Sequence, residues 1–170
     1  MLTSAGMSGY ATTGWENFFV AEVGASAALT GLLFVAVSIN LGKILAHPQL
    51  PGRAGETLLI LVGALAASTL GLVPGQSRVE LGAELLVVGF VVWALPALRH
   101  LRTRSAPGEP AYWLRTRVLT HELATLPFVI AGGSLLAERG GGLYWLAPGM
   151  ILAFAAGIVN AWVLLVEIQR

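Results

Sequence analysis

The stretch FFVAEVGASAALTGLLFVAVSINL, residues 18–41, decides the fold class, because among its 24 residues only Glu22 is charged. As an α-helix, a stretch of this length would extend about 36 Å, at about 1.5 Å per residue. The hydrocarbon core of a bilayer is about 30 Å thick, so the stretch is long enough to cross it. It predicts a transmembrane helix.

The composition of the whole chain gives the same indication. Of the 170 residues 56% are apolar and 11% are charged, and the mean hydropathy is +0.77. A soluble domain carries about 25% charged residues, because water must wet its surface. This chain has too little charge to cover a water-soluble globule of its size. Most of its surface is therefore expected to face lipid.

Four further apolar runs follow the first, each bounded by polar residues, Gly or Pro. The runs are continuous, whereas a membrane-spanning β-strand alternates apolar and polar residues. Ser77 and Glu80 precede the third run with the spacing of a helix capping box. The sequence therefore predicts an all-α integral membrane bundle of about five transmembrane helices. We expect one domain over residues 1–170, with spans at about 17–41, 56–74, 79–98, 116–137 and 143–167.

Several classes of function are not expected. The net charge of +1 gives no reason to expect a nucleic-acid partner, and the absence of cysteine excludes disulfides and thiolate chemistry. His121 and Glu122 are adjacent, so on a helix they point about 100° apart and cannot bind one metal ion as an i, i+4 pair does. No nucleophile accompanies them at a known catalytic spacing. We expect no metal, no cofactor and no enzyme activity.

Two acidic residues are expected inside the membrane at similar depths. Glu22 follows Trp15 by seven residues, and Glu84 follows Ser77 by seven, which places each about 10 Å from the same face. A carboxylate in the bilayer is costly, and such residues often mark ion or proton pathways. The pair could share a proton or a cation between the first and third spans. Alternatively, each reaches the interface or accepts one hydrogen bond between helices.

A polar stripe continues from Glu22 along the first span. Ser26, Thr30 and Ser38 follow it at helical spacing, and small residues such as Gly24 and Gly31 lie beside them. Such a face is typical of a helix–helix contact in which hydroxyl groups bond to their own backbone. A pore lining uses the same residue types, so both interpretations remain open.

Three further polar residues lie within the fourth and fifth spans. His121 and Glu122 would lie about 13 Å beyond Trp113, and Asn160 belongs to the last span. A histidine can relay protons near neutral pH. The alternative is that all three are hydrogen-bonding partners within the bundle.

The first span resembles a family of small polytopic bacterial inner-membrane proteins. The resemblance is carried by residues 14–21, GWENFFVA, and residues 24–41, GASAALTGLLFVAVSINL. It covers the first span and, loosely, the five-span layout. It implies a bacterial inner-membrane location and supplies no active residues.

Two functions fit these patterns. The first is an oligomeric channel or transporter for a small cation or a proton, with a pathway among Glu22, Ser26, Thr30, Glu84, His121, Glu122 and Asn160. The alternative is a non-catalytic membrane scaffold or regulator that acts through helix–helix contacts. The expected partners are the lipid bilayer and either further copies of the chain or another membrane protein.

The distribution of basic residues predicts the orientation. Five spans place on one side Lys43, Arg53, Arg99, Arg102, Arg104, Arg115, Arg117 and Arg170. The other side holds only Arg78 and Arg139, and positive residues stay in the cytoplasm. We expect a reporter fused after Arg170 to be cytoplasmic and one fused before Met1 to be external. Termini on the same side would contradict the five-span arrangement.

Overall fold

The computed structural model describes residues 9–46, 50–102 and 111–166, and within these ranges it contains helices and no strand. The helices are α1 (Glu16–Ile39), α2 (Leu41–Ala46), α3 (Leu50–Leu70), α4 (Arg78–Arg102), α5 (Ala111–Ala137), the 3₁₀ turn η1 (Gly142–Trp145) and α6 (Leu146–Val166). Five of the described helices are long and apolar enough to cross a membrane, and α2 and η1 are too short. The predicted class of an all-α membrane bundle with five spans is confirmed.

The helix ends differ from the prediction in several places: α3 ends at Leu70 rather than 74, α4 extends to Arg102 rather than 98, and α5 begins at Ala111 rather than 116. Two further differences have a visible cause. The second span was expected from about residue 56, whereas α3 begins at Leu50 and includes Arg53 and Glu56. Both residue types are good helix formers, and Pro51 fits the first turn, where no N–H is needed. The first span was expected to reach residue 41, but α1 ends at Ile39. The Asn40 side chain then donates to the Ala36 carbonyl at 3.1 Å, and α2 follows.

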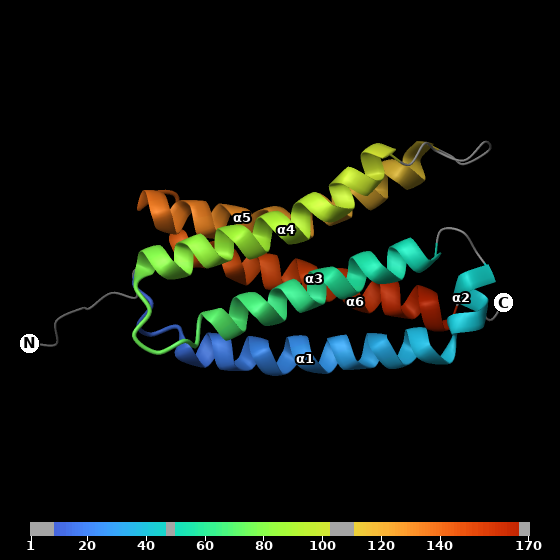
Figure 1. The fold of residues 1–170 in the computed structure, drawn as a ribbon, viewed down its shortest axis with the longest axis horizontal. Helices are drawn as coiled ribbons and strands as arrows, with labels where there is room; N and C mark the ends of the chain where they lie inside the picture. The colour runs from blue at the N-terminus through green and yellow to red at the C-terminus, as the bar shows by residue number, and fades with distance from the viewer. Residues whose placement is uncertain (1–8, 47–49, 103–110, 167–170) are drawn as a thin grey trace, which may run out of the picture.

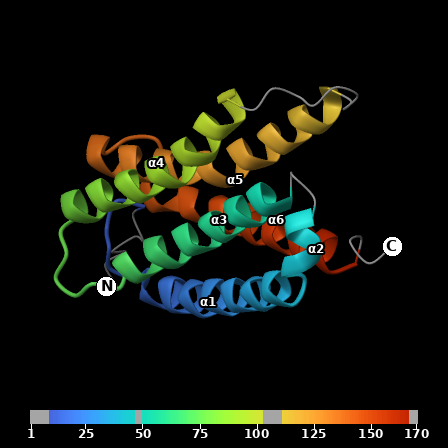
Figure 2. The same ribbon diagram turned by 45° about the vertical axis from the view of Figure 1, so that its right-hand side comes forward.

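The helices form two groups that run along the same axis (Figures 1 and 2). α4 and α5 lie against one another along one side of the bundle, and α1 lies along the opposite side. α3 is central, since it packs against α1, α4 and α6. We call one end of the bundle the Trp15 end (Trp15, Arg78, Glu138) and the other the Lys43 end (Lys43, Arg53, Arg99).

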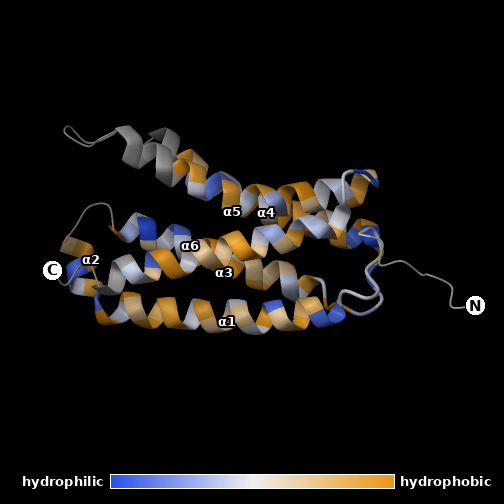
Figure 3. Cartoon of the chain, turned by 180° about the vertical axis from the view of Figure 1, so that it is seen from behind, coloured by the Kyte–Doolittle hydropathy of each residue, from blue (hydrophilic) through white to orange (hydrophobic). Residues whose placement is uncertain are grey.

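The outer surface of the bundle is apolar along the middle of the helices. Figure 3 shows hydrophobic residues over most of the helix lengths and hydrophilic residues mainly at the two ends. Leu32, Phe34, Val87 and Trp162 are each more than 60% exposed. A water-soluble monomer rarely exposes so large an apolar area, whereas a protein surrounded by acyl chains does. α1 is the most exposed of the five spans.

Glycines bring α4 and α5 into backbone contact. A Cβ atom at Gly132 would lie 2.4 Å from the Leu86 nitrogen, and one at Gly89 would lie 2.7 Å from the Val129 nitrogen. Lipid tails are as apolar as leucine, so helices in a membrane associate through close packing rather than through hydrophobic burial. The side-chain-free surfaces of these glycines allow that approach.

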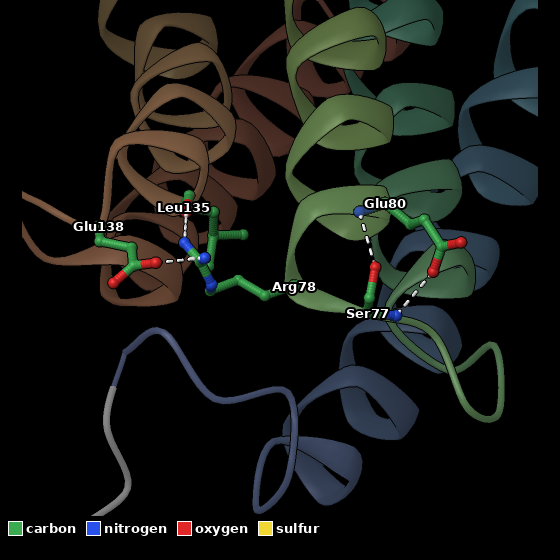
Figure 4. Close-up of polar contacts among 5 residues, drawn as sticks. All are labelled: Ser77, Arg78, Glu80, Leu135 and Glu138. Atoms are coloured by element: carbon green, nitrogen blue, oxygen red, sulfur yellow. Dashed lines mark hydrogen bonds and ion pairs between the residues drawn. The ribbon is translucent and has the colours of Figure 1, made fainter.

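Polar contacts fasten the Trp15 end. The predicted capping box is confirmed: the Ser77 N–H donates to Glu80 Oε2 at 2.8 Å, and the Glu80 N–H donates to Ser77 Oγ at 3.2 Å (Figure 4). Arg78 donates from Nη1 to the Leu135 carbonyl at 2.5 Å and forms an ion pair with Glu138 (Figure 4). The start of α4 is thereby joined to the end of α5.

The segment before α1 closes over the same end. The Leu143 N–H donates to the Gly9 carbonyl at 2.7 Å, and the Gly141 N–H donates to the Tyr10 hydroxyl at 2.9 Å. The Trp15 and Tyr144 rings meet edge to face with centroids 5.2 Å apart. The turn between α5 and α6 is therefore fixed to the beginning of the described chain.

The α4–α5 contact can be tested with two neighbouring glycines of α5. We expect Gly132→Ala to lower the free energy of unfolding by about 1–3 kcal/mol, because the new methyl group would meet the α4 backbone. Gly133→Ala is the control: its Cβ would have nothing within 4 Å, and alanine favours a helix by up to about 1 kcal/mol. Denaturant titration in micelles measures both. Equal effects of the two substitutions would contradict a backbone contact at Gly132.

Candidate functional site

The Glu22 side chain has a buried carboxylate oxygen without a hydrogen-bond partner in the described part of the chain. It lies on α1, half-buried, and its Oε2 atom is buried with no hydrogen-bond partner among the described residues. Most buried polar atoms in proteins have a partner, so such an atom needs an explanation. Glu22 stays a candidate for binding a proton or a cation.

The hydroxyl groups that follow Glu22 bond within their own helix. Ser26 donates to the Glu22 carbonyl at 2.6 Å, Thr30 to the Ser26 carbonyl at 2.7 Å and Ser38 to the Phe34 carbonyl at 2.8 Å. Ser26 is fully buried. This bonding matches the helix-contact interpretation of the stripe, because the hydroxyl protons are already donated.

Four small residues of α1, Ala21, Gly24, Ala28 and Gly31, face away from the other helices. A Cβ atom at Gly24 or Gly31 would meet nothing within 4 Å, and Ala21 and Ala28 are exposed. Within one chain these residues therefore allow no close approach of a neighbour. The open face they form lies toward lipid or toward another protein.

Glu84 lies on a different contact from Glu22. Its carboxylate accepts a hydrogen bond from Gln76 Nε2, and the residue lines an open cavity of about 330 Å³ with Leu70, Ala83, Val87 and Val88, whose accessible walls are almost entirely apolar. This cavity lies between α3 and α4. No hydrogen bond joins Glu22 to Glu84 among the described residues, and α1 packs against α3 and α6.

His121 and Glu122 both bond to Trp93 of α4. His121 Nε2 lies 3.1 Å from the Trp93 carbonyl oxygen, and the Trp93 Nε1–H donates to Glu122 Oε2 at 2.8 Å. Thr125 donates to the His121 carbonyl at 2.8 Å. Although the two α5 side chains point in different directions, they hold the backbone and the ring of one residue. They fix α4 against α5 in the half of the bundle toward the Lys43 end.

Asn160 joins α6 to α3 toward the Lys43 end. Arg53 Nε donates to Asn160 Oδ1 at 2.8 Å, and Asn160 Nδ2 donates to Thr57 Oγ1 at 2.8 Å. Thr57 in turn donates to the Arg53 carbonyl at 2.9 Å. The three side chains form a closed set of hydrogen bonds, so Asn160 has the bonding of a structural contact.

A second cavity between α3 and α4 lies at the Lys43 end. Its volume is about 230 Å³, and it is lined by Gly55, Glu56, Leu59, Leu95, Pro96 and Arg99. Glu56 is buried, with 8% of its surface exposed. The sequence analysis did not select Glu56, because it lies at the edge of an apolar run. Its spacing to Ile60 and Gly63, four and seven residues, is a helical signal that could have revealed its inward face.

A tight contact separates the two cavities. Gly63 of α3 and Val92 of α4 are both buried, and a Cβ atom at Gly63 would lie 2.4 Å from Val92 Cγ2. Gly63 follows Glu56 by seven residues and precedes Leu70 by seven, about 10 Å in each direction. The α3–α4 seam (the two cavities and this contact) therefore has an acid-bearing cavity toward each end and a constriction midway.

Pro96 changes the backbone beside the constriction. It is inside α4 and has no N–H to donate to the Val92 carbonyl, which accepts from that position in a regular helix. The carbonyl of Val92 thus lacks its usual helical donor. This places a backbone oxygen with spare hydrogen-bonding capacity next to the narrowest part of the seam.

Comparison with known proteins adds no relative: no protein-family model, no curated protein and no solved structure matches this chain.

Glu22 and Glu122 differ in their hydrogen bonds, and replacing each by leucine tests whether this difference affects stability. We expect Glu22→Leu to leave the free energy of unfolding unchanged or higher, since its carboxylate has no bond to lose. Glu122→Leu should lower it by about 1–3 kcal/mol, because the Trp93 N–H would lose its acceptor. Denaturant titration in micelles compares the two variants. A loss at Glu22 as large as that at Glu122 would contradict this assignment.

Proposed function

We propose that this chain moves a small cation or a proton across a bacterial inner membrane along the α3–α4 seam. The observation that carries the proposal is the position of Glu84 and Glu56 in separate cavities of one seam. Carboxylates are costly inside a membrane and often mark ion or proton pathways. In this function Glu84 binds the cation near the Trp15 end and Glu56 binds it near the Lys43 end.

The constriction supplies the barrier that such a pathway requires. Val92 fills the space above Gly63, so the two cavities are not joined in this conformation. Passage requires a small separation of α3 from α4, with the Val92 carbonyl as an intermediate oxygen ligand. His121 and Glu122 would act as positioning residues, because they hold Trp93, the neighbour of Val92, on α5.

The bonding of the polar residues supports a pathway along the α3–α4 seam rather than one along α1. The Ser26 and Thr30 hydroxyl groups already donate to the α1 backbone, whereas the α3–α4 cavities have open volume beside carboxylates. In this proposal Glu22 lies outside the seam and would bind a proton or a cation separately, on α1. The basic residues support an orientation with the Trp15 end outside and the Lys43 end in the cytoplasm.

A homo-oligomer would cover the open side of the seam. Val87 beside the first cavity and Leu95 beside the second are at least half exposed, so in a single chain lipid would reach both cavities. A second copy packed there would replace lipid by protein and shield an ion in passage.

Purified protein in liposomes tests the proposal with pH-sensitive and ion-sensitive dyes. We expect flux above that of empty liposomes, a severalfold loss in Glu84→Gln and Glu56→Gln, and a gain in Val92→Ala, which removes the methyl groups at the constriction. Val79→Ala is the matched control, because Val79 is 54% exposed and lines neither cavity, so its flux should equal that of the wild type. Thermal stability is recorded for each variant. Flux that is unchanged in both glutamine variants would overturn the pathway.

The second candidate function is a non-catalytic scaffold, favoured by the open space at Gly24 and Gly31 on α1. Absence of flux for every ion tested would select it if the α1 face also forms a contact. Because the chain has no cysteine, a single Ala28→Cys substitution gives an unambiguous crosslink between copies in native membranes. Ala155→Cys, exposed on α6, is the matched control and should remain uncrosslinked.

A further inference from the structure

Glu22 lies on the side of α1 that faces the other helices. Phe19 and Ser26, one turn away in either direction, are both fully buried, and α1 packs against α3 and α6. The Glu22 Oε2 atom is buried and has no hydrogen-bond partner among the described residues. The residue is half-buried and lies about 10 Å along the helix from Trp15, inside an apolar span. The part of the side chain that the protein leaves uncovered is therefore next to acyl chains.

The hydroxyl groups nearest to Glu22 on α1 supply no proton to its carboxyl group. Ser26 donates to the backbone carbonyl of Glu22, and Thr30 donates to the backbone carbonyl of Ser26. A hydroxyl group has a single proton to donate. Both protons are therefore held by the helix backbone, and neither can stabilise a carboxylate ion at Glu22.

The neighbouring helices supply no charge that would neutralise Glu22. Among the described residues of α2, α3 and α6, which pack against α1, the charged ones are Lys43, Arg53 and Glu56. All three lie toward the Lys43 end, whereas Glu22 lies in the second turn of α1, near the Trp15 end. The other charged residue of α1 is Glu16, which has the same sign. An ionised acid placed in apolar surroundings without a partner is so costly that it takes up a proton instead.

From the unpartnered oxygen and the lack of donors and countercharge we infer that Glu22 is a proton-binding site inside the membrane, occupied by a proton at neutral pH. A metal ion is a poorer fit, because it needs several oxygen ligands at once. The described residues contain no group of three or more His, Cys, Asp or Glu side chains that could hold one. The inference does not rest on the proposed function, since α1 lies outside the α3–α4 seam.

A carboxyl group that holds a proton within lipid has a characteristic reaction with the apolar reagent dicyclohexylcarbodiimide. The acid adds across one C=N bond of the reagent: its oxygen bonds to the central carbon and its proton passes to nitrogen. The acyl group then moves from oxygen to the other nitrogen and gives a stable N-acylurea, with no atom lost. The ionised form has no proton to supply. Formation of this adduct therefore reports a protonated carboxyl group that the reagent reaches through the bilayer.

Labelling of the full chain in phosphatidylcholine nanodiscs with dicyclohexylcarbodiimide at neutral pH tests the inference, and peptide mass spectrometry locates the adduct. We expect the main adduct at Glu22 and its loss in Glu22→Gln. Glu122→Gln is the matched control: it removes another carboxyl group within a span, one that accepts a hydrogen bond from Trp93, and it should keep the full label. Sodium or potassium added at constant pH should not reduce the label at Glu22.

A water-soluble carbodiimide with an added amine provides a second measurement that needs no variant. This reagent forms an amide at carboxyl groups in contact with water. Glu16 is exposed at the start of α1, so it should be modified severalfold more than Glu22. Equal modification of the two residues would show that the Glu22 side chain reaches the membrane surface, and it would overturn the inference.

Two further results would also overturn it. Absence of a dicyclohexylcarbodiimide adduct at Glu22 would mean that the carboxyl group holds no proton there. Protection of Glu22 by sodium or potassium would identify a metal cation as its ligand. The flux assay separates this inference from the seam pathway: labelling of Glu22 in a protein that shows no flux would support the proton site and overturn the pathway.

Discussion

The backbone contact between α4 and α5 is the constraint on which the other features depend. Because lipid provides no hydrophobic force between helices, this pair is held by close packing at Gly89 and Gly132 and by polar bonds at defined points. Once α5 is in place, His121 and Glu122 fix Trp93. The opposite face of α4 then presents Glu84, Val92 and Arg99 to α3.

Polar groups in the bundle follow two patterns. Hydroxyl groups donate to the carbonyl one turn earlier in their own helix, as Ser26, Thr57 and Thr125 do, so they cost little to bury. Groups with longer side chains bond between helices, as Arg53 does with Asn160. Glu84 of the α3–α4 seam follows neither pattern, because its carboxylate accepts from Gln76 in the loop before its own helix.

Local features of this fold could be predicted from the sequence, and its helix contacts could not. Continuous apolar runs determine the five spans, and the Ser77–Glu80 capping box depends only on residues close in the chain. The inward position of Glu56 depends instead on which face of α3 meets α4. The glycines illustrate the same limit: those of α1 look suited to helix packing yet face outward, while Gly132 makes the close contact. Spacing alone does not specify the partner of a small-residue face.

The bonding at the Trp15 end also has a consequence for the order of assembly during synthesis. The Gly9 carbonyl accepts from the Leu143 N–H, so a residue made before the five spans bonds to a residue made just before α6. α1 likewise packs against α6, which is made after the other four spans. The early helices can insert one by one, but this end can close only after residue 143 has been made. Until then the first span has only part of its final packing, and an interrupted chain would leave it available to other membrane proteins.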